Sequence, residues 1–147
     1  MLTNADITIY NKYYDMNDKC TKYKRSYLQG VNYKISDGVS NLSTRKGPSN
    51  KKETIIYIPF FDVYVEGKSY LKPKAYQSLE EVEKDKYFTL NDGDIVVKGI
   101  IDFELSEEKG SNIKYLNENY DDVGIINTVV TYDCGSDYMK HWKVVCS

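Results

Sequence analysis

The chain has 147 residues, of which 41% are hydrophobic, and its 20 Lys and Arg face 22 Asp and Glu for a net charge of −2. This composition is typical of one globular domain and excludes an intrinsically disordered chain. No apolar run approaches the roughly 18 residues of a membrane span, and the start MLTNADITIYNKYYD lacks the basic and apolar regions of a signal peptide. We therefore expect a single domain, residues 1–147, that is made in the cytosol and has no membrane contact.

Charge is unevenly divided along the chain. Residues 1–52 hold ten Lys or Arg and four Asp or Glu, a net charge of +6, whereas residues 53–147 hold ten and eighteen, a net charge of −8. Such a division suits head-to-tail assembly or attraction of an anionic partner, and it is equally compatible with a solvated surface that binds nothing. The 15 tyrosines indicate many strands or many subunit contacts, or simply an AT-rich gene.

Short runs of alternating apolar and polar residues occupy the first half of the chain. They predict strands at residues 7–10, 22–28, 54–58 and 61–65. Between the second and third of these, residues 36–53 read SDGVSNLSTRKGPSNKKE and hold almost no large apolar side chain. Loops longer than about 12–15 residues are uncommon in compact domains unless they are functional or disordered.

We expect this segment, residues 36–53, to be a mobile polar loop. Its basic residues would contact phosphates without reading a base sequence. They are Arg45, Lys46, Lys51 and Lys52. The alternative is a solvated loop with no binding role.

The second half of the chain predicts strands and two short helices. Ser78 and Glu81 have the spacing of a capping box, which predicts a helix over residues 78–87, and an apolar stripe predicts another helix after Ser111. Alternation predicts one strand over residues 94–105, with Asp94 on the face that meets water or a neighbour and with a bulge or a close backbone approach at Gly99, and another strand over residues 124–132. The buried face of the 94–105 strand should hold the core anchors Ile95, Val97, Ile101 and Phe103.

The C-terminal stretch MKHWKVVC, residues 139–146, contains the only histidine and the only tryptophan of the chain. Alternation along a strand places the core anchors Trp142 and Val144 on the buried face, with His141 and Lys143 on the other. The elements together predict a mainly β (α+β) fold, a small antiparallel β-barrel or sandwich with two short helices and a long polar inter-strand loop.

Residues typical of catalytic chemistry are scarce. With one histidine, every His-based triad or multi-histidine metal site would have to be built around His141. The cysteines, Cys20, Cys134 and Cys146, are far apart and form no CxxC pair, so we expect reduced thiols and no zinc site. No phosphate-binding, nucleophile-elbow or zinc-protease motif is present. We expect no enzyme activity, no catalytic residue, no metal and no cofactor.

Several motifs, taken together and in order, carry a family resemblance. They are TNADITIYNKYYD, YKRSYLQGVNY, Ile58-Pro59-Phe60, YLKPKAYQSL, NDGDIVVKGIIDFEL and DDVGIINTVVTYDCGSDYMKHWKVV. This series resembles small neck proteins from tailed phages of low-GC Gram-positive bacteria, and it spans nearly the whole chain. One position departs from the pattern, because Tyr33 stands where that family has tryptophan.

The resemblance implies a virion structural protein, a ring-forming head–tail connector of the neck, and most specifically the head-closure (stopper) subunit. Such a protein is assembled in the host cytoplasm and resides in the virion. Its partners would be further copies of itself in a hexamer or dodecamer, the portal and adaptor proteins above, the tail terminator or tail tube below, and packaged double-stranded DNA in the channel. The implied interface candidates are Tyr23, Arg25, Tyr27, His141 and Lys143.

Three alternatives stay open from the sequence. Within the same neck assembly, a tail terminator that caps the tail tube has a similar size. Outside it, a nucleic-acid-binding β-barrel module and an enzyme without a recognisable motif remain.

Overall fold

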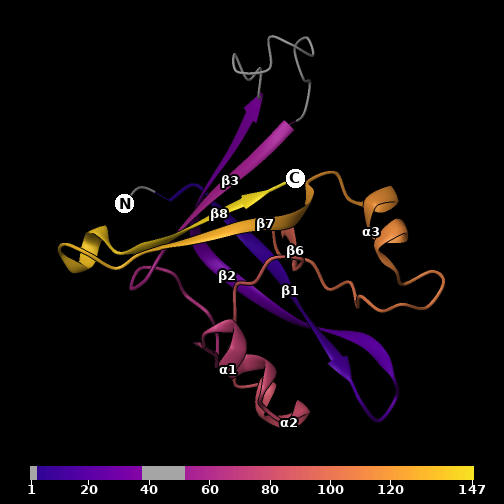
Figure 1. The fold of residues 1–147 in the computed structure, drawn as a ribbon. Coiled ribbons are helices and arrows are strands. Elements are labelled where there is room, and N and C mark those ends of the chain that lie inside the picture. The colour runs from indigo at the N-terminus through magenta and orange to yellow at the C-terminus, as the bar shows by residue number, and fades with distance from the viewer. Residues whose placement is uncertain (1–2, 38–51) are drawn as a thin grey trace, which may run out of the picture.

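Six strands form a closed antiparallel barrel in the computed structural model, which describes residues 3–37 and 52–147 (Figure 1). Around the barrel the order is β1-β2-β3-β8-β7-β6, and β6 pairs back onto β1. The strands are β1 (Ala5–Asp15), β2 (Cys20–Asp37), β3 (Lys52–Pro59), β6 (Ile95–Lys98), β7 (Val123–Tyr132) and β8 (His141–Cys146). The prediction of a mainly β antiparallel fold is confirmed.

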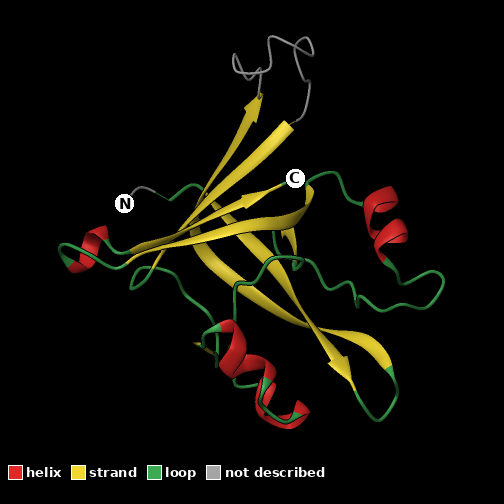
Figure 2. Cartoon of the chain, in the orientation of Figure 1, coloured by secondary structure: helices red, strands yellow, loops and turns green. Residues whose placement is uncertain are grey.

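The helices lie outside the barrel, as Figure 2 shows. A parallel pair, β4 (Ser69–Tyr70) and β5 (Tyr87–Phe88), brackets α1 (Pro73–Gln77) and α2 (Glu81–Lys84). The third helix, α3 (Ile113–Asn119), precedes β7, and a 3-10 helix, Asp137–Met139, lies between β7 and β8. None of the helices in the described residues is long and apolar enough to cross a bilayer.

The helix predicted over residues 78–87 is present as α2 but spans only Glu81–Lys84, because Ser78 belongs to the end of a separate preceding helix. The preceding helix, α1, begins at Pro73, which needs no amide hydrogen at that position. Ser78 ends this helix as its C-cap, and its Oγ donates to the carbonyl of Ala75 at 2.7 Å. The capping-box side chain is therefore used at the end of one helix, and α2 begins without a side-chain cap.

The barrel interior is filled by apolar side chains from all six strands. Trp142 and Val144 lie there as predicted, 6% and 1% exposed. The other buried members are Ile7, Ile9, Leu28, Val31, Tyr33, Ile56, Ile58, Phe88, Leu90, Val96, Ile126 and Cys146.

A second core lies on the outer side of β1 and β6. Val96 faces the barrel interior, whereas Ile95 and Val97 alternate to the outside. There they pack with Tyr10, Leu105 and Leu116, and Ile101 and Phe103 are partly buried against them. The four predicted anchors of this region are therefore core residues, but of this outer cluster. Both faces of β6 are buried.

The predicted strand over residues 94–105 is much shorter in the structure. It ends at Lys98, because Gly99 adopts a φ of +93°, a conformation that glycine tolerates and that turns the chain away from the sheet. Residues 100–106 form no strand. Asp94, expected on the face opposite the core, is buried at 1% exposure. Residues 61–65 are not a strand either, since only Tyr64 forms an isolated bridge with Gln29.

Candidate interaction surfaces and polar clusters

One outer wall of the barrel is open to solvent. We define the open wall as the outward-facing side chains of the upper part of β2 and of β3, β8 and β7: Lys34, Ile55, Tyr57, Val130, Tyr132, His141, Lys143 and Val145. These residues lie in register across the strands, with Tyr57 and Val130 on either side of Lys143. All are exposed or half-buried. The wall mixes aromatic, aliphatic and basic side chains.

His141 is the centre of an aromatic group on the open wall. Its ring stacks on Tyr132 at 4.8 Å between centroids and meets Tyr57 edge-on at 5.6 Å. The Nδ1 atom lies 2.7 Å from the carbonyl of Met139, to which it donates. Lys34 Nζ lies 5.5 Å from the Tyr57 ring centroid. His141 is therefore a packing residue of an outer surface, as alternation predicts. Sequence reasoning missed Tyr57 and Tyr132, although both share the outward period of their strands.

The β7–β8 hairpin carries this surface beyond the barrel (Figure 1). Residues 131–139 are all exposed, including Tyr138 at 76% and Met139 at 63%. Large apolar side chains exposed side by side are typical of a surface that binds another molecule.

Two predicted interface residues of β2 contact another segment of this same chain. Arg25 Nη1 lies 2.9 Å from Glu104 Oε1 and donates to the carbonyl of Phe103 at 3.3 Å. Tyr23 packs against the outer core. Tyr27 lies beneath the Arg25 guanidinium, 5.4 Å from ring centroid to Cζ. All three are half-buried, and their part in a subunit contact stays a prediction.

The segment that Arg25 holds covers the wall formed by β1 and β6. We call residues 99–122 the acidic cover, because they contain seven acidic residues against Lys109 and Lys114. All seven are exposed, and Glu104 is the only one of the seven that has an ion-pair partner among the described residues. They are Asp102, Glu104, Glu107, Glu108, Glu118, Asp121 and Asp122.

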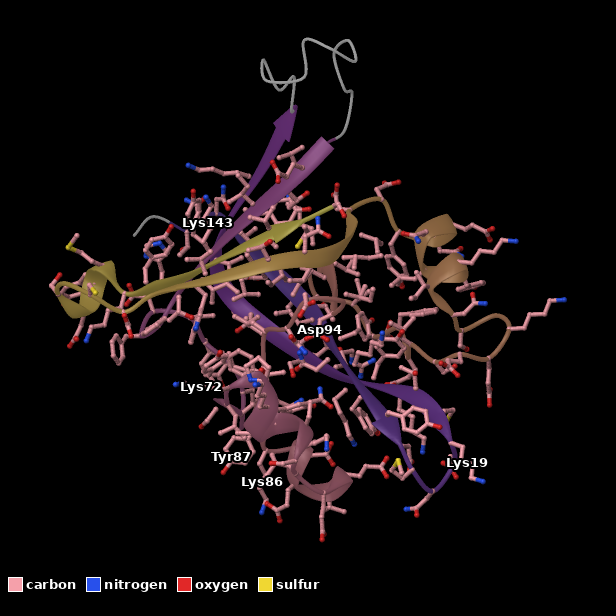
Figure 3. All side chains as sticks on the ribbon, in the orientation of Figure 1. Lys19, Lys72, Lys86, Tyr87, Asp94 and Lys143 are labelled. Atoms are coloured by element: carbon pink, nitrogen blue, oxygen red, sulfur yellow. The ribbon has the colours of Figure 1, made fainter. Side chains whose placement is uncertain are left out.

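A buried polar network ties β1 to the turn before β6, and Figure 3 shows Asp94 amid other side chains. Asp94 accepts hydrogen bonds from the Asn11 amide at 2.9 Å and from the backbone amides of Lys12 and Asn91 at 3.0 and 3.2 Å. Burial raises the pKa of Asp94 to about 6, and the three donors oppose that rise. Each carboxylate oxygen is already bound within the chain, so this network is a structural clamp.

A cleft of about 560 Å³ lies between the β1–β2 hairpin and α2. Its most unusual residue is Lys84, which is 4% exposed and donates to the Leu79 carbonyl. The Lys84 amine also lies 5.3 Å from the Tyr13 ring centroid and 5.6 Å from that of Tyr76. Burial lowers the pKa of Lys84. The amine joins α2 to the end of α1 and to the hairpin, which is a structural task.

The basic cluster predicted for the long loop falls mostly outside the described residues. Arg45, Lys46 and Lys51 lie there, and Lys52 begins β3 opposite Asp37, the last residue of β2. The described residues also contain no group of three or more His, Cys, Asp or Glu placed to hold a metal ion.

Comparison with known proteins places the chain in one family. No curated protein and no solved structure matches it. The model of a family of unknown function, DUF6751, matches residues 2–147. The chain belongs to this family.

Proposed function

We propose that this chain is a structural subunit of the neck of a tailed phage, a ring-forming head–tail connector, and within the neck the head-closure (stopper) subunit. The observation that carries the proposal is the ordered series of motifs along the sequence. ITIYNK lies in β1, the YKRSYLQGVNY stretch lies in β2, and the closing motif makes up β7 and β8.

Features of the fold support a structural role. The barrel presents an open wall with exposed aromatic side chains, and a hairpin projects from it. Strands β2 and β3 remain paired up to Asp37 and Lys52, which extends this wall of the barrel to the ends of both strands. The buried titratable groups of Asp94 and Lys84 are both bonded within the chain, which favours a structural role for them over catalysis.

The test uses a phage whose genome encodes this chain and carries a nonsense mutation in its gene. We expect lysates to contain heads that have packaged and lost DNA, beside free tails of normal length. Purified wild-type chain should join these heads to tails. Tails of abnormal length with stable full heads would indicate a tail terminator instead. Normal joined particles would contradict a neck role of either kind.

A further inference from the structure

The open wall and the acidic cover lie on opposite sides of the barrel. The cover packs on β1 and β6 through the outer core, in which Tyr10 comes from β1 and Ile95 and Val97 come from β6. The open wall is centred on β8. In the ring order β1-β2-β3-β8-β7-β6, β8 is three strands from β1 in either direction. One wall of the barrel is thus covered, and the opposite wall is bare.

These two surfaces have opposite charge. Lys34 and Lys143 on the open wall have no ion-pair partner among the described residues. Among the described side chains of these strands, Glu53 at the N-terminal end of β3 is the one acidic residue that faces outward, while the exposed Asp133 and Asp137 lie beyond the wall in the hairpin. The cover holds six acidic side chains that are likewise unpaired in the described part of the chain. The unpaired basic side chains of the open wall therefore complement the unpaired acidic side chains of the acidic cover.

We propose that the open wall binds the acidic cover of a second copy of this chain, in a head-to-tail contact. This inference rests on the ring-forming part of the proposed function and names the two surfaces involved. Because the two surfaces differ, the contact is heterologous, and repetition gives a closed ring when the rotation between copies divides a full turn. Two open walls facing each other would bring like charges together, which disfavours a two-fold dimer through this surface.

The aromatic side chains supply the apolar part of the contact. Tyr57, Tyr132 and His141 form a rigid group that is already stacked, so little side-chain freedom is lost when a partner covers it. On the cover, Tyr115 is 41% exposed and stacks on Phe103 at 5.5 Å between centroids. Aromatic residues at the centre with complementary charges around them are typical of specific protein interfaces. A nucleic acid on the open wall would leave the unpaired acidic cover without a partner.

The test uses two charge-reversed variants of the full chain. In the first, Lys34→Glu and Lys143→Glu make the open wall acidic. In the second, Glu107→Lys, Glu108→Lys and Glu118→Lys leave four acidic residues against five lysines, which makes the cover basic. Sedimentation equilibrium over a concentration series at low salt measures association, and circular dichroism verifies that each variant is folded. The matched control for the first variant is Lys72→Glu with Lys74→Glu, two exposed positions at the start of α1, of which Lys72 is labelled in Figure 3.

We expect the wild type and the control to associate equally, and added salt to weaken this association. Each charge-reversed variant alone should lose association, because both of its surfaces carry the same sign. An equimolar mixture should regain it, since each acidic wall then meets a basic cover and each basic wall an acidic cover. If the first variant does not fold, Lys34→Gln with Lys143→Gln should weaken association instead.

Several results would overturn the inference. They are a wild type that stays monomeric over the whole series, a reversed variant that associates like the wild type, and a mixture that stays monomeric. Retention of wild-type monomer on duplex DNA, lost in the first variant alone, would assign the open wall to nucleic acid. The contact and the neck role can fail separately. If the mixed variants associate but the chain is absent from virions, the contact is supported and the neck role is contradicted. If the chain forms a ring in the neck through other surfaces, the neck role is supported and this contact is contradicted.

Discussion

Asn11 and Asp94 meet side chain to side chain in the interior, with Asn11 Nδ2 donating to Asp94 Oδ2 at 2.9 Å. The same amide donates to the Thr89 carbonyl at 2.6 Å, and its oxygen accepts from the Thr89 amide at 3.2 Å. A single side chain on β1 therefore fixes the chain segment that enters β6. This clamp lies directly beside the β1–β6 pairing that closes the barrel.

Replacing Asn11 by alanine should destabilise the fold by about 2 kcal/mol or more, because buried donors and acceptors lose their partner. Urea unfolding followed by circular dichroism measures the change. Asn17→Ala is the control, since Asn17 is exposed and its loss should change stability by less than about 0.5 kcal/mol. Equal stability of the two variants would show that the clamp contributes nothing.

Asp94 should make stability depend on pH. Its pKa is raised from 3.8 to about 6 in the folded chain, so the folded state holds the proton more tightly than the unfolded state. The stabilisation from that proton is complete below about pH 4 and is lost as pH rises through 6, a change on the order of 3 kcal/mol. Asp94→Asn removes this dependence. The difference between wild-type and variant stability, measured from pH 4 to 7, should slope in that sense, and a flat difference would contradict it.

The two rarest side chains of MKHWKVVC should differ sharply in their effect on stability. Trp142 lies 4.2 and 4.4 Å, ring centroid to ring centroid, from Phe60 and Tyr70 in the barrel interior. We expect Trp142→Ala to cost about 3–5 kcal/mol. His141→Ala, at the neighbouring outward-facing position, should lower the stability by only about 1 kcal/mol or less, because it removes the stacking on Tyr132. Thermal unfolding by circular dichroism measures both, and the reverse order would refute the assignment of faces.

Leu116 tests whether the acidic cover is packed on the barrel. It is fully buried in the outer core, so Leu116→Ala should destabilise the chain by about 2–5 kcal/mol. Amide hydrogen exchange over residues 99–122 should then speed up more than exchange in β8. Lys114→Ala, an exposed position on the same helix, should leave both measurements unchanged. Unaltered exchange in the Leu116 variant would mean that the cover is not held by this side chain.

Local patterns in the sequence predicted the strands that lie within one alternating run. Trp142 and Val144 are buried and His141 and Lys143 face outward because β8 keeps a strict period of two. The same reasoning failed after Lys98, where the positive φ of Gly99 ends the strand while Ile101 and Phe103 still pack against the outer core. The alternation in the sequence therefore predicted correctly which side chains pack against the core, although the backbone there is not a strand.

Features that join distant segments could not be read from the sequence. The pairing of Ile9 with Val96 closes the barrel, and no local signal connects these positions. Asp94 was expected away from the core because two of its three donors, the Asn11 side chain and the Lys12 amide, belong to the distant strand β1. The open wall was predicted in part, because alternation placed His141 and Lys143 outward. Its aromatic group could not be predicted, because it forms only when β3 and β7 flank β8.

The most direct measurement of the central claim is a reconstruction of the virion of a phage that encodes this chain. The account predicts a ring of these barrels in the neck, between the portal assembly and the tail, with the open wall of each copy against the acidic cover of the next. Absence of the chain from the virion, or its presence only in the capsid shell or the distal tail, would contradict it.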